Sequence, residues 1–169
     1  MRLFIAIKIA PNSELYDILH KLETYGKAVE LENIHLTLKF LGEVIDAGKT
    51  ISALELIKFK SFDLELKGMD VLPNERKPRI LFLRAFPEDI LNSLASEIDT
   101  ATKEIIRDHP FTPHITVLRI KNYGDLKNIV EEYKNKYILK HKVSHFSLFK
   151  STLTPKGPIY EELKKFQLI

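Results

Sequence analysis

The chain of 169 residues contains no cysteine and no tryptophan, and it has only two methionines. The absence of cysteine excludes disulfides, thiol nucleophiles and cysteine-ligated metal sites. No apolar run approaches the roughly 20 residues of a membrane-spanning helix, and Met1 leads directly into a core-like strand rather than a signal peptide. We therefore expect a soluble, cytoplasmic protein.

The sequence also lacks a strong excess of charge of either sign. It has 26 Lys and Arg against 23 Asp and Glu, a formal net charge of +3. This balance permits a phosphate-bearing ligand without requiring nucleic acid. Lysines gather at 134–142 and 150–165, where a solvated charged surface is favoured over a patch that follows RNA. The length allows one domain, or two tightly joined lobes.

What the sequence does contain is one four-residue pattern in two copies, His35-Leu36-Thr37-Leu38 and His114-Ile115-Thr116-Val117, whose histidines are 79 positions apart. In a strand, alternate side chains share a face, so each His and its Thr point the same way while the aliphatic residues point into a core. One copy alone would be weak evidence, because Thr is common in strands. Two matched copies predict two imidazoles presented to one ligand.

The motifs occupy matching places in a longer repeat. The motif at His35 follows a strand-like run at 2–7, a proline at 11 and a helical apolar pattern at 15–22. The motif at His114 follows a strand-like run at 79–85, a proline at 87 and a helical apolar pattern at 90–105. Although α+β chains also alternate strands and helices without duplication, we favour duplicated strand–helix–strand units near 2–42 and 79–120. This predicts one α+β domain over 1–169, bilobal, with two pseudo-twofold-related antiparallel sheets, helices packed outside and a central cleft.

The remaining elements are predicted from shorter patterns. Gly26 is expected to end the first helix. The other expected elements are helices at 47–58 and 125–136, a strand at 62–67, one long or two shorter strands at 137–153, a turn at 155–158 and a final short element at 160–168.

Two histidines suit the hydrolysis of a strained phosphodiester such as a 2′,3′-cyclic end on RNA, without a metal. One neutral imidazole takes a proton from water while the other, protonated, gives a proton to the departing ribose oxygen. A bell-shaped pH profile follows from these opposite protonation states. Thr37 and Thr116 could donate hydrogen bonds to the non-bridging phosphate oxygens, although strand propensity alone also explains them.

Other candidate sites are weaker. His141 and His145 have the spacing of two helical metal ligands, but their flanks indicate extended chain and no Glu lies between them, so no metal site is expected. His20 and His109 have no evident partner. No glycine-rich phosphate loop is present.

The motifs and their surroundings resemble the 2H phosphoesterase superfamily, and within it the RNA 2′,3′-cyclic phosphodiesterases once called 2′-5′ RNA ligases. The similar segments follow the family's order over essentially the whole chain: 2–6, 32–44, 78–81, 111–117 and 151–160.

The resemblance implies a bilobal fold with both motifs in its cleft. It implies hydrolysis of RNA 2′,3′-cyclic phosphate ends to 2′-phosphomonoesters with no metal or other cofactor, and a weak reverse 2′-5′ joining activity. By position, His35 would donate the proton to the leaving 3′ oxygen and His114 would accept the proton that activates water. The implied partner is RNA, for example tRNA halves, and a monomer is expected.

The family also tends to have a basic residue five positions after the second His, near the bound phosphate. Here that residue is Arg119. Strict alternation places it on the face of Ile115 and Val117, away from His114, so only a bulge or the end of the strand would turn it inward.

The missing tryptophans are a departure from the family, which often has one before the first motif and one after the Pro-Arg pair. Ala28 or Val29 and Phe82 occupy those places. If the first tryptophan stacks on a terminal base, the grip on substrate here is expected to be weaker or different.

Two other functions remain open. The same pair of histidines would serve a phosphodiesterase that acts on small cyclic nucleotides. The third hypothesis is a non-catalytic module that binds RNA ends. The two intact motifs disfavour it, because a protein that only binds needs no second imidazole.

Overall fold

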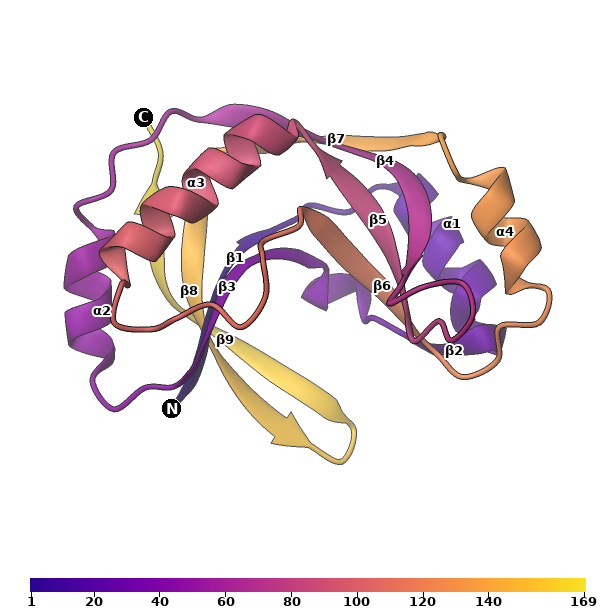
Figure 1. Cartoon of the computed structure of the whole chain (residues 1–169), viewed down its shortest axis with the longest axis horizontal. Coiled ribbons are helices and arrows are strands. Elements are labelled where there is room, and N and C mark those ends of the chain that lie inside the picture. Colours follow the sequence, from indigo (N-terminus) through magenta and orange to yellow (C-terminus); the bar gives the residue numbers. More distant parts are fainter.

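The computed structural model describes all residues, 1–169, as two antiparallel sheets with helices on their outer sides (Figure 1). The four-stranded sheet contains, in spatial order, β3 (His35–Glu43), β1 (Arg2–Lys8), β8 (His145–Thr154) and β9 (Gly157–Gln167). The five-stranded sheet contains β2 (Gly26–Ala28), β6 (His114–Ile120), β5 (Ile80–Phe86), β4 (Phe62–Leu72) and β7 (Tyr137–Val143). The prediction of a bilobal α+β fold is confirmed.

Four α-helices accompany the sheets: α1 (Ser13–Leu22), α2 (Ala47–Leu54), α3 (Glu88–Ala101) and α4 (Leu126–Glu132). Two 3₁₀ turns, Glu23–Tyr25 and Leu31–Asn33, complete the secondary structure. Helix α1 begins at Ser13, because the side chain of Asn12 accepts a hydrogen bond from the backbone N–H of Leu15 at 2.9 Å and caps the helix. No helix is both long and apolar enough to cross a bilayer.

The lobes interleave, so they do not correspond to the two halves of the chain. Helix α1 follows β1 but contacts β2, β6 and β7 of the other sheet, and α3 follows β5 but contacts β3 (Figure 1). A single core of 37 buried residues includes strands of both sheets. The orders β3-β1-β8-β9 and β6-β5-β4-β7 correspond strand for strand, which is what a duplicated unit would produce; the duplication itself stays a prediction.

Several element bounds differ from the predicted ones. Helices α2 and α4 are shorter than the apolar patterns, and 137–153 divides into two strands around Ser144. Strand β4 continues past the alternating segment 62–67 to Leu72, and its register against β5 shifts between Leu66 and Met69. Gly68 lies in this bulge with φ +88°, and a Cβ there would come within 2.6 Å of the carbonyl oxygen of Lys134.

Gly26 has a different role from the predicted one. Helix α1 already ends at Leu22, and Gly26 opens β2 instead. A Cβ at this position would lie 2.1 Å from the carbonyl oxygen of Arg119 on β6. Gly26 therefore permits a close backbone approach between β2 and β6.

Candidate active site

The two histidines are the first residues of two neighbouring strands. His35 is the first residue of β3 and His114 is the first residue of β6, and these strands contact each other across the two lobes. Each His and its Thr are half-buried, as expected for one shared face. The four aliphatic residues of the motifs are buried in the common core: Leu36, Leu38, Ile115 and Val117.

Both imidazoles are held in the same way. The Nδ1 atom of His35 lies 2.6 Å from the carbonyl oxygen of Asn33, and the Nδ1 atom of His114 lies 2.6 Å from that of Thr112. A carbonyl oxygen only accepts, so Nδ1 carries the proton in each ring and Nε2 is left free. The hydrogen-bond pattern thus assigns both rings one tautomer, with Nε2 available for proton transfer.

Burial lowers the pKa of His35 below its ordinary value near 6.5, against the opposing effect of the hydrogen bond to Asn33. The nearby charge of His114 lowers this pKa further. The two rings are therefore close enough to repel each other when both are protonated. One neutral and one protonated ring is the arrangement that avoids this repulsion.

The surroundings of His35 are aromatic. Its ring lies 5.3 Å from the ring of Phe4 and 5.3 Å, edge to face, from that of Tyr160 on β9. Phe4 in turn stacks on Phe149 at 5.3 Å. On the other strand, Phe82 packs edge to face on His114 at 5.4 Å. Phe82 therefore contacts the second imidazole.

A β-bulge decides the orientation of Arg119. Consecutive residues of β5 pair with Leu118 and Thr116, so Val117 is an extra residue in β6. Val117 and Leu118 are both buried, and Arg119 is exposed. The bulge thus reverses the alternation and places Arg119 on the face of His114, so the orientation predicted from strict alternation is wrong.

Tyr160 locates Arg119 more closely. Burial raises the pKa of the Tyr160 hydroxyl, while the charges of Arg119 and Arg2 oppose this rise. Arg119 therefore lies near the tyrosine whose ring touches His35. A cation from the five-stranded sheet and an aromatic ring from the four-stranded sheet accompany the two imidazoles.

A matching bulge in β3 links the two motifs through their backbone. Strand β3 has two register shifts against β1, and Leu38 is the extra residue at the one within the motif, as Val117 is in β6. The carbonyl oxygen of Leu38 accepts a hydrogen bond from Nη1 of Arg107 at 2.7 Å, and that of Val117 accepts one from the backbone N–H of Val29 at 2.9 Å. Arg107 precedes His114 in the chain and Val29 precedes the first motif. Each motif is therefore tied to the segment that leads into the other.

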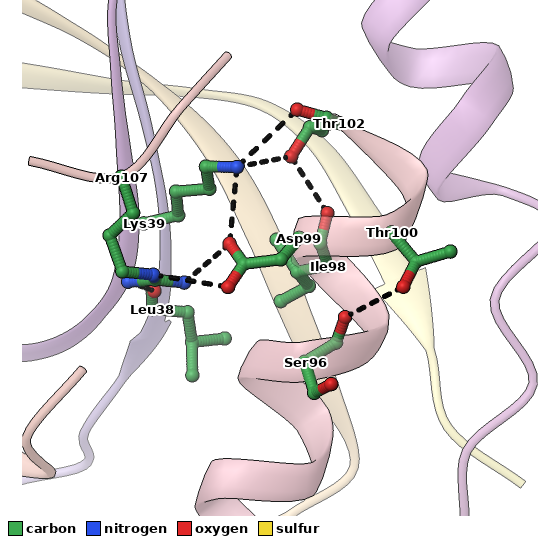
Figure 2. Close-up of polar contacts among 8 residues, drawn as sticks. All are labelled: Leu38, Lys39, Ser96, Ile98, Asp99, Thr100, Thr102 and Arg107. Carbon is green, nitrogen blue, oxygen red and sulfur yellow. Dashed lines mark hydrogen bonds and ion pairs between the residues drawn. The ribbon is translucent and has the colours of Figure 1, made fainter. Parts of the chain in front are cut away.

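Arg107 belongs to a polar cluster beside the first motif (Figure 2). Its Nη2 and Nε atoms lie 2.8 Å and 3.2 Å from the two carboxylate oxygens of Asp99 on α3. Lys39, whose side chain is 1% exposed, pairs with Asp99 at 3.1 Å and donates to the hydroxyl of Thr102 at 2.9 Å. The only sequence signal for this cluster was a lysine within the apolar run 34–41.

The remaining histidines do not gather into a metal site. His141 lies on β7 and His145 on β8, both in extended chain as predicted, and Nδ1 of His141 accepts a hydrogen bond from the backbone N–H of Ala10 at 3.3 Å. His20 lies 3.5 Å from the carboxylate of Glu23. No group of three or more His, Cys, Asp or Glu side chains has a metal-binding arrangement.

A bilobal α+β fold with two His-x-Thr motifs on contacting strands is the arrangement expected of a 2H phosphoesterase. The family described as "LigT like Phosphoesterase" matches residues 7–82 and 85–160. The chain belongs to this family, so the predicted membership of the 2H phosphoesterases is confirmed.

Individual relatives cover the whole chain. A Methanocaldococcus jannaschii protein named RNA 2′,3′-cyclic phosphodiesterase is 35% identical over 98% of this chain and 100% of its own length. An Archaeoglobus fulgidus protein of the same name is 34% identical over 99% of this chain and 100% of its own length. Among solved structures, TT0787 of Thermus thermophilus gives a TM-score of 0.81 at 31% identity, covering 99% of this chain and 97% of that one. E. coli LigT complexed with 3′-AMP gives 0.76 at 27% identity with the same coverage.

Proposed function

We propose that this protein hydrolyses 2′,3′-cyclic phosphate ends of RNA to 2′-phosphomonoesters by metal-free acid–base catalysis with His35 and His114. The observation that carries the proposal is the pair of imidazoles on contacting strands, each with Nδ1 bound to a carbonyl and Nε2 free. The names of the relatives supply the substrate class. The implied RNA includes the ends left by cleavage, such as those of tRNA halves.

In the proposed reaction, His114 accepts a proton from water as the water oxygen forms a bond to phosphorus. The bond from phosphorus to the 3′ oxygen breaks on the opposite side, and protonated His35 gives its proton to that oxygen. The product keeps its phosphate on the 2′ oxygen, and the two rings have exchanged protonation states. An RNA 5′ hydroxyl in place of water would give a 2′-5′ linkage, which accounts for weak joining.

Three side chains would act on the charge that develops at phosphorus. Thr37 and Thr116 share the faces of the histidines, so their hydroxyls can donate to the non-bridging oxygens. The bulge turns Arg119 to the same side, where its guanidinium can offset the added negative charge.

The lowered pKa of His35 gives this assignment a pH signature. The active form needs His35 protonated and His114 neutral, and the two rings titrate as a coupled pair, so the lowered pKa of His35 should place one limb of the kcat/KM profile, which reports the free enzyme, below pH 6.5. A bound phosphodiester anion favours the imidazolium and raises the pKa. The alkaline limb of kcat, which reports the complex, should therefore lie at higher pH than that of kcat/KM. Initial rates between pH 4.5 and 9 test both profiles, and a kcat/KM profile with no limb below pH 6.5 would contradict the lowered pKa of His35.

The proposed reaction itself is tested with an RNA oligomer that ends in a 2′,3′-cyclic phosphate, incubated with the protein in EDTA. We expect a 2′-phosphate end, because neither imidazole needs a metal to exchange its proton. A 3′-phosphate product, or loss of activity in EDTA that added metal restores, would contradict the proposal. An unchanged cyclic end would direct the search to small cyclic nucleotides, and then to binding without turnover.

A further inference from the structure

A groove of about 960 Å³ lies beside His114, which is one of its lining residues. Its walls are the loop between β4 and β5 and the segment that precedes β6. The lining residues that matter here are Arg76, Lys77, Arg79, His109, Thr112 and His114. A volume of this order suits a ligand larger than one phosphate.

The groove is positively charged, and no carboxylate in its lining neutralises that charge. Arg76, Lys77 and Arg79 are exposed, none of them takes part in an ion pair, and no carboxylate lines the groove. Glu75 belongs to the same loop but is not part of the lining. Three clustered like charges repel one another, and a polyanion in the groove would relieve that repulsion.

The loop that carries these charges is held at both ends. The side chain of Asn74 accepts hydrogen bonds from the backbone N–H groups of Arg76 at 2.9 Å and Lys77 at 3.1 Å. The backbone N–H of Arg79 donates to Leu72 at 2.7 Å, and its carbonyl accepts from Ile120 of β6 at 2.8 Å. The cations are thus presented on a defined turn fixed to the strand that carries His114.

The two walls of the cleft differ in chemistry. The rings of Phe4 and Tyr160 surround His35. Phe4 is buried, so the half-buried ring of Tyr160 is the surface on which a nucleobase can stack. On the side of His114 the groove offers charge instead. A 2′,3′-cyclic end leaves the 5′ oxygen as the single point at which the RNA chain continues, so upstream phosphates must leave the active site along the cleft.

We propose that this groove binds the phosphodiester backbone of the RNA upstream of its cyclic end, with Arg76 and Lys77 contacting phosphates. The inference rests on the proposed function and extends it, because it makes the protein selective for a polynucleotide over a nucleoside 2′,3′-cyclic phosphate. The sequence signal is three basic residues within 76–79, and the lysine-rich segments at 134–142 and 150–165 are not part of this groove.

The test compares two substrates, a decaribonucleotide that ends in a 2′,3′-cyclic phosphate and cytidine 2′,3′-cyclic phosphate, with wild type and the double variant Arg76→Ala/Lys77→Ala. We expect the variant to raise KM for the oligonucleotide by about tenfold near physiological salt and to lower the slope of log KM against log salt by about 2. Turnover of the cytidine substrate should not change. The control Lys58→Ala/Lys60→Ala removes two exposed lysines between α2 and β4, an equal change of charge, and should leave both substrates unaffected.

An unchanged KM for the oligonucleotide, or an equal loss with the cytidine substrate, would overturn the groove proposal. If wild type converts neither substrate, the proposed function fails, but the groove is still tested by fluorescence anisotropy of the labelled oligonucleotide. Weaker binding and a smaller salt slope in the groove variant would support it there, and equal binding by wild type and variant would overturn it.

Discussion

Replacement of either His35 or His114 by alanine is expected to lower kcat/KM on an RNA 2′,3′-cyclic end by about 10²–10⁴-fold. Each ring would move one proton in the transition state, and no other titratable side chain of the two motifs could replace it. The fold should persist, because each side chain is half-buried and its one hydrogen bond goes to a carbonyl two residues upstream. Unchanged thermal unfolding would show that lost activity is not lost structure.

The double variant gives the sharper measurement. Because the two imidazoles act in one step, removal of both should cost little more than removal of one. His20→Ala is the matched control, since that side chain is exposed and its partner is Glu23 on the outside of the molecule; it should retain full activity. Activity near that of wild type in either single variant would refute the two-histidine mechanism.

The sequence predicts the parts of this site that depend on local pattern. Alternation within each motif places the aliphatic residues in the core and leaves His and Thr on the other face. Alternation fails at the bulges. It puts Lys39 on the face of His35 and Phe40 in the core, whereas Lys39 is 2% exposed and Phe40 is 67% exposed. An extra residue in one strand is a property of its pairing with another strand, which a single segment does not encode.

The sequence does not predict the packing partners of the helices, for a similar reason. The apolar stripes of α1 and α3 predict that each helix covers a sheet, but not which sheet. Each one covers the sheet that it does not follow in the chain. As a result Asp99 and Arg107, far from the first motif in sequence, reach the backbone and the lysine beside it.

The contact between Asp99 and Lys39 is expected to have a large effect on the stability of the fold. Asp99→Ala is expected to lower the free energy of unfolding by about 2 kcal/mol, because it leaves the buried ammonium of Lys39 without a counter-charge, while the 42% exposure of the Asp99 side chain reduces the effect below that of a fully buried pair. Partial burial raises the pKa of Asp99, but hydrogen bonds from Arg107 and Lys39 outweigh it and hold this pKa below its ordinary value of 3.8. The contribution of the ion pairs is therefore complete at pH 7 and is lost only as the pH falls through that lowered pKa.

Lys39→Met separates the ion pair from the packing of the side chain. It removes the buried charge together with its desolvation cost and keeps a similar volume, so we expect stability equal to or above that of wild type. Thr102 remains satisfied, since its hydroxyl donates to the carbonyl oxygen of Ile98 at 2.7 Å, and Asp99 keeps Arg107. Urea unfolding at pH 7 measures the stability of both variants. The control is Glu104→Ala, which removes an exposed ion pair with Lys49 and should lower the free energy of unfolding by less than about 1 kcal/mol. If Lys39→Met were as destabilising as Asp99→Ala, the lysine charge itself would be needed to hold α3 against β3, and the ion pair would be a net source of stability.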